Sequence, residues 1–192
     1  MNDSQQIQEE GSAVAIQRRR LLYAGVAATA GLCGAGLALW NHSATDAGEK
    51  IDPSLWQRKF ETPAGGTTLD MTSFQGKPLV LNFWATWCPP CVEEMPLLNR
   101  FFRENSSKGW QVVGLAIDKP ESVRRFLRDF AVGYPIGMAE SDGIGLAQSL
   151  GNLSGGLPFS LVITGTGAIV QRKIGRLSPS DLSAWASFEF SG

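Results

Sequence analysis

The segment from residue 79 to residue 102 constrains the fold of this chain more than any other. Leu79–Trp84 is a short, mostly apolar run, typical of a strand that is buried on both faces of a sheet. Residues 92–102 show the apolar spacing of a helix. Between them lies Trp-Cys-Pro-Pro-Cys, which places Cys88 and Cys91 at the turn from strand to helix. The pattern predicts an α/β domain with a redox-active dithiol at this turn.

The predicted helix start assigns different roles to the two cysteines. Unpaired backbone N–H groups and the positive end of the helix dipole stabilise a thiolate, so the pKa of Cys88 should be depressed. Residues three apart share a helix face, so Cys91 should lie within bridging distance of Cys88. We therefore expect Cys88 to attack a disulfide and Cys91 to resolve the mixed disulfide. Pro89 suits the first helical position, whereas Pro96 falls inside the helix and should kink it.

Two other interpretations of the cysteine pair remain open. A zinc site would need two more soft ligands, and the chain offers only Cys33 and His42, both far upstream beside an apolar segment. A static structural disulfide would close a very small loop, which constrains little of the unfolded chain. A catalytic dithiol explains the position at the helix start better than either.

Three separated segments resemble one known family. Residues 82–91, followed by Glu94-Met95-Pro96, resemble the active-site segment of the membrane-anchored thioredoxin-like family that includes the TlpA and ResA proteins. Ser73–Pro78 resembles the start of that family's first central strand, and Gly156–Phe159 resembles the segment with its cis-proline. The resemblance covers residues 55–188. It implies a thioredoxin-like fold, with a central mixed sheet flanked by helices, an N-terminal β-hairpin and a central insertion.

The resemblance also implies roles for residues outside the dithiol. Pro158 should follow a cis peptide bond, pack opposite the cysteine pair and belong to the catalytic site, and Leu157 and Pro158 should contact the substrate. The role of Trp87 is inferred from its position instead: beside Cys88, its ring should form an apolar lip for a protein substrate. Trp84 is expected to be a core residue.

Glu94 is the candidate acid–base group. It follows Cys91 by three residues, so it should share the helical face of the dithiol and exchange a proton with Cys91. The alternative is an exposed carboxylate that interacts with the helix dipole, a role that suits Glu93 better. Asn82 stands where ordinary thioredoxins have a buried aspartate. Since an amide does not ionise, acid–base work would fall to Glu94 or to water.

The N-terminal sequence predicts export. Arg18–Arg20 precedes Leu21–Trp40, an uncharged run of a length that can span a bilayer, and no lysine or arginine follows between Asn41 and Glu49. We predict a cytoplasmic segment (1–20), a transmembrane anchor or signal (21–40), a linker (41–54) and a thioredoxin-like domain (55–192). The protein would then be a single-pass protein of the inner membrane with its domain in the periplasm. The alternative is an exported protein whose signal is cleaved. Arg18 and Arg19, followed by Leu21 and Leu22, partly resemble a signal of the twin-arginine type. Cys33 is interpreted as an apolar residue of the span, and His42 as a linker residue.

The composition gives no reason to expect nucleic acid as a partner, because 17 Lys and Arg nearly balance 18 Asp and Glu. We expect a monomer that acts on protein thiols and disulfides, with no metal or organic cofactor, since the Cys88–Cys91 disulfide carries the electrons. The resemblance implies a reductase supplied by a membrane electron donor, as in cytochrome c maturation. A peroxide-reducing enzyme on the same fold and a redox-inert binding or chaperone module remain alternatives.

Further elements follow from periodicity and turn residues. Strand pairs are predicted at Trp56–Phe60 with Thr67–Met71 and at Phe159–Thr164 with Ala168–Arg172, and one more strand at Gln111–Ile117. A helix should bury Val123, Phe126, Leu127 and Phe130, and a short helix in the insertion should span Ile144–Leu150. Ser178 and Pro179 should cap and start the last helix.

Overall fold

The computed structural model describes residues 48–188. The predicted cytoplasmic segment, the predicted anchor and the first half of the predicted linker lie outside the described residues. Within residues 48–188, no helix combines the length and hydropathy that crossing a membrane requires.

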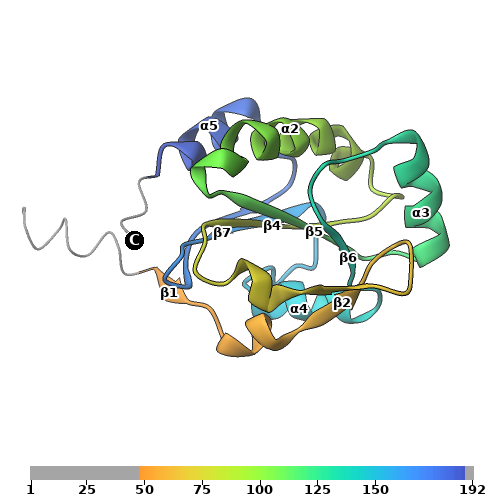
Figure 1. The fold of residues 1–192 in the computed structure, drawn as a ribbon, viewed down its shortest axis with the longest axis horizontal. Helices are drawn as coiled ribbons and strands as arrows, with labels where there is room; N and C mark the ends of the chain where they lie inside the picture. The colour runs from red at the N-terminus through yellow and green to blue at the C-terminus, as the bar shows by residue number, and fades with distance from the viewer. Residues whose placement is uncertain (1–47, 189–192) are drawn as a thin grey trace, which may run out of the picture. The chain divides into compact units, whose positions relative to one another are not determined.

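The described chain alternates strands and helices in the order of a thioredoxin-like domain (Figure 1). The strands are β1 (Glu49–Lys50), β2 (Lys59–Glu61), β3 (Thr68–Asp70), β4 (Leu79–Trp84), β5 (Gln111–Ala116), β6 (Ile136–Met138), β7 (Phe159–Ile163) and β8 (Ala168–Ile174). The α-helices are α2 (Pro89–Asn105), α3 (Pro120–Asp129), α4 (Asp142–Ser149) and α5 (Pro179–Ala186). Short 3₁₀ helices are η1 (Pro53–Gln57), η2 (Met71–Phe74) and η3 (Ser106–Lys108).

The strands form one mixed sheet in the order β1-β8-β7-β4-β5-β6-β2-β3. β4 pairs in parallel with β5 and antiparallel with β7, so it occupies the centre of the sheet. All six residues of β4 are buried, as the apolar run predicts. The strand that leads into the dithiol is therefore held on both sides by hydrogen bonds and on both faces by side chains.

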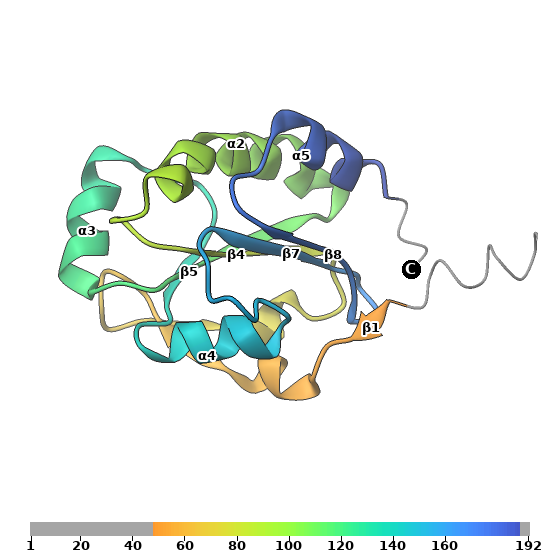
Figure 2. The same cartoon turned by 180° about the vertical axis from the view of Figure 1, so that it is seen from behind.

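Helices cover both faces of the sheet (Figures 1 and 2). α2 and α5 lie side by side on one face, and α4 lies on the other. The α2-face core includes Trp84, Met95, Leu98 and Trp185, together with both cysteines of the pair. The α4-face core includes Leu81, Phe83, Leu115, Leu146 and Phe159. Alternate residues of β4 thus contribute to opposite cores, as the period of a strand requires.

The predicted elements agree with the structure in type, and three details differ. The folded unit begins at Gly48 rather than at residue 55, because β1 pairs with β8 and Ile51 is buried in the α4-face core. The second part of the predicted linker is therefore part of the domain. In the first hairpin the leading strand begins at Lys59, since η1 takes up Trp56. Phe130 does not face the core. It is about half exposed and stacks on Phe126.

The predicted start of the last helix, with Ser178 as the cap and Pro179 as the first residue, is confirmed. Ser178 accepts a hydrogen bond from the Asp181 N–H, and the Asp181 carboxylate accepts one from the Ser178 N–H at 2.7 Å. Pro179 occupies the first helical position. This reciprocal cap satisfies donors that the helix leaves unpaired. It also fixes the chain just after Leu177, a residue that contributes to the active site.

Candidate active site

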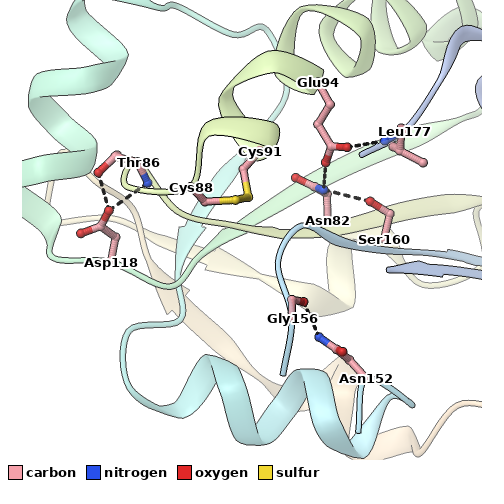
Figure 3. Close-up of a disulfide and its surroundings, with 10 residues drawn as sticks. All are labelled: Asn82, Thr86, Cys88, Cys91, Glu94, Asp118, Asn152, Gly156, Ser160 and Leu177. Carbon is pink, nitrogen blue, oxygen red and sulfur yellow. Dashed lines mark hydrogen bonds between the residues drawn. A yellow bond between two sulfur atoms is a disulfide. The ribbon is translucent and has the colours of Figure 1, made fainter. Parts of the chain in front are cut away.

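The two cysteines form a disulfide at the N-terminal end of α2 (Figure 3). Cys88 is the N-cap residue with an extended backbone, and Cys91 lies in the first turn. Their Cα atoms are 5.3 Å apart, within the usual range for a disulfide. The bridging distance predicted from the spacing is confirmed.

The two prolines between the cysteines remove backbone N–H donors that the sequence predicted would stabilise a Cys88 thiolate. Pro89 and Pro90 have no N–H, so the helix start lacks two of the donors that could stabilise a Cys88 thiolate. The next two N–H groups, of Cys91 and Val92, both bond the Cys88 carbonyl oxygen, at 3.0 and 3.2 Å. Stabilisation by free N–H groups, as the sequence suggested, is therefore not available in this disulfide form. The dipole of the following helix remains.

Access to the two sulfur-bearing residues differs. Cys88 is 5% exposed, whereas Cys91 is fully buried. Trp87, directly before Cys88, is 65% exposed, and Trp84 is fully buried, as expected for a core residue. The chain thus presents a large exposed aromatic ring directly beside the more accessible cysteine.

The loop that leads to Cys88 is fixed from β5. Both the N–H and the hydroxyl of Thr86 donate to the same Asp118 carboxylate oxygen, at 2.9 and 2.5 Å (Figure 3). Asp118 follows β5, the parallel neighbour of β4. Hydrogen bonds to a charged acceptor are stronger than neutral ones. The carboxylate therefore ties the loop before Cys88 to the segment that follows β5.

Glu94 of α2 is fully buried, so the alternative of an exposed carboxylate that interacts with the helix dipole is wrong. One carboxylate oxygen accepts from Asn82 Nδ2 and the other accepts from the Leu177 N–H, each at 2.7 Å (Figure 3). Glu93, by contrast, is more than half exposed and forms an ion pair with Arg176. Of the two neighbouring glutamates, Glu94 is therefore the buried carboxyl near the cysteine pair and Glu93 is the exposed carboxylate.

Burial raises the pKa of Glu94 from 4.5 to about 7. The hydrogen bonds from Leu177 and Asn82 oppose this rise because they favour the charged form, and the positive charges of Lys173 and Arg176 oppose it as well. A carboxyl with a pKa near neutrality can accept and release a proton at physiological pH. Its position one turn beyond Cys91 suits proton exchange with a thiol.

Asn82 and Ser160 complete the environment of Glu94. Asn82 Nδ2 also donates to Ser160 Oγ, at 2.9 Å, and both side chains are fully buried. The sequence singled out Asn82 only as a departure from thioredoxin and did not identify Ser160 or Leu177. A polar residue within the apolar run of β4 was the available signal for Asn82. No local signal marks the other two residues.

Leu157 and Pro158 are joined by a cis peptide bond, as the resemblance implied. Pro158 is buried, and Leu157 packs against the core that contains both cysteines. The loop before them is held by buried Asn152, whose Nδ2 donates to the Gly156 carbonyl oxygen at 2.8 Å (Figure 3). Asn152 was not predicted from the sequence as a support for this loop.

Within the described part of the chain, no group of three or more His, Cys, Asp or Glu side chains is placed to hold a metal ion. The chemistry at hand is that of the dithiol and a nearby buried carboxyl. A cysteine pair that opens a helix after a central strand of a thioredoxin-like sheet defines a thiol-disulfide oxidoreductase.

Comparison with known proteins agrees with this class. The Redoxin family model matches residues 46–185. A thiol-disulfide oxidoreductase ResA of Bacillus cereus is 30% identical over 157 residues, which cover 80% of this chain and 88% of that protein. The chain belongs to the Redoxin family and, within it, to the group of TlpA- and ResA-like thiol-disulfide oxidoreductases.

Solved structures support the same fold. A thiol:disulfide interchange protein of the thioredoxin family from Chlorobium tepidum TLS has a TM-score of 0.58 at 28% identity and covers 67% of this chain and 90% of its own. A secreted disulfide oxidoreductase from Mycobacterium tuberculosis has a TM-score of 0.58 at 24% identity and covers 71% of this chain and 98% of its own. The predicted thioredoxin-like fold is confirmed, and the substrates of such an enzyme are protein thiols and disulfides.

Proposed function

We propose that this oxidoreductase works as a reductase of protein disulfides, with Cys88 as the attacking residue and Cys91 as the resolving residue. One observation carries the assignment of roles. Cys88 is the N-cap residue and retains some exposure, whereas Cys91 is fully buried one turn before the buried Glu94. A substrate sulfur can reach only the more accessible cysteine.

The reaction proceeds in two exchanges. In the reduced enzyme the Cys88 thiolate attacks one sulfur of the substrate disulfide, that S–S bond breaks, and the departing substrate thiolate takes up a proton. Cys91 then loses its proton to the Glu94 carboxylate and attacks Cys88 Sγ. The mixed disulfide breaks, the second substrate sulfur leaves as a thiolate that takes up a proton, and the Cys88–Cys91 disulfide forms. Two electrons pass from the enzyme to the substrate, and a dithiol donor returns them.

Glu94 fits the second exchange because resolution needs a base beside a thiol that water does not reach. With a pKa near 7 the carboxyl is partly ionised at neutral pH, so it can take the Cys91 proton and later release it. Asn82 and Leu177 hold the carboxylate in place through its two oxygens.

Substrate contacts are proposed for Trp87, Leu157 and Pro158. Trp87 offers its exposed ring on one side of Cys88, and the Leu157–Pro158 segment packs against the core around the cysteine pair. Proline has no N–H and cannot donate a hydrogen bond, so the backbone beside Pro158 stays open. An extended stretch of the substrate would pair with this open backbone.

The proposed setting is the periplasmic side of the inner membrane. Arg18–Arg20 and the uncharged run Leu21–Trp40 support an anchor or an export signal. The resemblance to TlpA and ResA proteins supports the reducing direction, a membrane electron donor and a place in cytochrome c maturation. We propose that the enzyme acts as a monomer and needs no cofactor beyond its own dithiol.

The decisive experiment combines a protein-disulfide reduction assay with substrate trapping. The reduced protein should release thiols from a protein disulfide, Cys88→Ser should abolish this, and Cys91→Ser should accumulate a mixed disulfide on Cys88. Cys33→Ser is the matched control, because it removes the third cysteine outside the motif and should retain full activity. In intact cells, rapid alkylation should find the Cys88–Cys91 pair mostly reduced. A mostly oxidised pair would contradict the reducing direction.

Two further measurements, on the purified protein and on the Cys88→Ser variant in cells, distinguish the alternative functions. A peroxide-reducing enzyme would consume peroxide faster than it reduces a protein disulfide. A redox-inert binding module would keep its cellular function in the Cys88→Ser variant.

A further inference from the structure

Asn152 lies in the loop that joins α4 to β7 and leads into the Leu157–Pro158 segment. Its side chain is fully buried, although asparagines are mostly exposed. Both ends of the amide are used, since Nδ2 donates to the Gly156 carbonyl oxygen at 2.8 Å and Oδ1 accepts from the Ser154 hydroxyl at 3.1 Å. A buried polar group whose donor and acceptor are both satisfied fixes the conformation of the groups around it.

Backbone hydrogen bonds fix the position of Asn152 relative to α4. Its N–H donates to the Ala147 carbonyl oxygen near the end of the helix, and its carbonyl oxygen accepts from the Gly155 N–H, both at 2.9 Å. Gly155 has a φ of +67°, a conformation that glycine adopts without strain and that reverses the chain here. The turn therefore brings Gly156 back to the Asn152 amide and ties it to the end of a helix.

The two ends of the loop are attached to the β8 region. Arg172 Nε donates to the Leu150 carbonyl oxygen at 2.7 Å, and the Gly175 N–H donates to the Pro158 carbonyl oxygen at 2.8 Å. Leu157 packs its side chain against both cores of the sheet. Its backbone N–H, by contrast, has no hydrogen-bond partner among residues 48–188. A backbone donor of this kind takes its partner from outside the chain, either water or another protein.

The bond from Asn152 determines which way this N–H points. A peptide unit is planar, and in a trans unit the C=O and the following N–H point in opposite directions. The unit between Gly156 and Leu157 is trans, so a Gly156 carbonyl oxygen held by Asn152 turns the Leu157 N–H away from Asn152. In Figure 3, Asn152 reaches Gly156 from the side opposite to the Cys88–Cys91 disulfide. The unpaired N–H is thus directed to the side of the loop on which the disulfide lies.

We propose that Asn152 is a positioning residue for substrate capture. It orients the Gly156–Leu157 peptide so that the Leu157 N–H donates to a backbone carbonyl oxygen of an extended protein substrate joined to Cys88. This inference rests on the proposed function, in which the substrate pairs with the backbone beside Pro158. A protein substrate has a backbone carbonyl to offer at this place, whereas a small aliphatic disulfide has none. The Asn152 amide therefore favours protein disulfides over small ones.

The first test looks for the bond in an adduct with a peptide. A peptide with one cysteine, activated as its thionitrobenzoate disulfide, is added to the full chain in detergent carrying Cys33→Ser and Cys91→Ser. The Cys88 thiolate attacks the peptide sulfur and thionitrobenzoate leaves, so the adduct forms whichever way electrons flow in the cell.

Hydrogen exchange, followed by NMR, then compares the adduct with the free protein. The Leu157 amide should exchange freely in the free protein and at least about tenfold more slowly in the adduct, since a hydrogen bond protects it. The Asn152 side-chain amide should stay protected in both states. Equal exchange of Leu157 in the two states, or free exchange of the Asn152 amide in the adduct, would overturn the proposal.

The second test removes the Asn152 amide. Asn152→Ala truncates the side chain, and Asn152→Leu keeps its branched shape without a donor, so that a failure of one variant to fold leaves the other. In either variant the protection of Leu157 in the adduct should be lost. KM for a protein disulfide should rise about two- to tenfold, the contribution of one hydrogen bond. Reduction of a small aliphatic disulfide and alkylation of Cys88 should keep their wild-type rates, whereas a general loss of structure would slow reduction of both substrates.

Asn99→Ala is the matched control. The Asn99 side chain also holds the backbone of a glycine, because its Oδ1 accepts from the Gly133 N–H at 2.7 Å, but in a different loop. This variant should change neither KM nor the exchange of Leu157. An unchanged KM for the protein disulfide in the Asn152 variants, or an equal change for both substrates, would refute the positioning role.

The outcomes also separate this inference from the proposed function. An adduct with a protected Leu157 amide, in a protein that does not reduce protein disulfides, would contradict the proposed function and leave the role of Asn152 standing. Reduction of protein disulfides without protection of Leu157 would do the reverse.

Discussion

Replacing Glu94 by glutamine should remove a pH dependence from the stability of the disulfide form. Folding raises the pKa of this carboxyl from 4.5 to about 7, so the folded state favours the protonated form. As pH rises above 4.5 the unfolded chain releases this proton, while the folded protein keeps it until about pH 7. The unfolding free energy should consequently fall with rising pH across this window and become independent of Glu94 above it.

The magnitude follows from the same two values. Each pKa unit corresponds to about 1.4 kcal/mol, so the rise from 4.5 to about 7 makes the folded wild type about 3 kcal/mol less stable at pH 8 than at pH 4 through this group alone. Glutamine has one acceptor oxygen for two donors, Asn82 Nδ2 and the Leu177 N–H. Glu94→Gln should therefore carry a constant penalty of about 1–3 kcal/mol but no slope from this residue.

The assay is urea unfolding of the oxidised protein at intervals from pH 4 to pH 8, without reductant. The difference in unfolding free energy between wild type and Glu94→Gln cancels the contributions of other titrating groups. This difference should change by about 3 kcal/mol between pH 4 and pH 8. Glu93→Gln, which removes the exposed neighbouring carboxylate, is the control and should keep the wild-type decline. A difference curve for Glu94→Gln that stays flat would refute the assignment of a near-neutral pKa to Glu94.

Three further outcomes are expected. Asp181 has its pKa lowered to about 2 by hydrogen bonds from Lys173 and from its helix cap. Its carboxylate stabilises the fold above pH 4, and this contribution is lost as pH falls toward 2, so Asp181→Asn should lower the unfolding free energy at pH 7 by about 1–2 kcal/mol and flatten the acid limb of an unfolding series. Trp87→Ala should change stability by less than about 0.5 kcal/mol, since the ring is mostly exposed, yet raise KM several-fold for a protein disulfide and not for a small aliphatic disulfide. Asp118→Asn should destabilise the protein by about 1–2 kcal/mol. In a double-mutant cycle with Thr86→Val the two losses should be less than additive, because both substitutions act on the hydrogen bond from the Thr86 hydroxyl to the Asp118 carboxylate.

Local chemistry in the sequence was sufficient for much of the fold and for the dithiol. The apolar run of β4, the prolines at the start of α2 and the cap of α5 act within a few residues of where they stand, so their consequences could be predicted. The spacing of Cys88 and Cys91 fixed their bridging distance in the same way. The same local reasoning overstated the free N–H groups at the helix start, because it did not follow where each donor bonds.

Contacts between distant segments decided what the second glutamate of α2 does. Glu94 and Glu93 are neighbours with similar local context, and only the packing of α2 against the sheet buries one and exposes the other. The partners of the buried carboxylate come from β4 and from Leu177, which is 83 residues away in the chain. Sequence alone therefore determined the reacting pair and the strand–turn–helix unit that presents it. The acidity of the group beside that pair was set by tertiary structure, because desolvation depends on everything that surrounds a charge and no single segment supplies those surroundings.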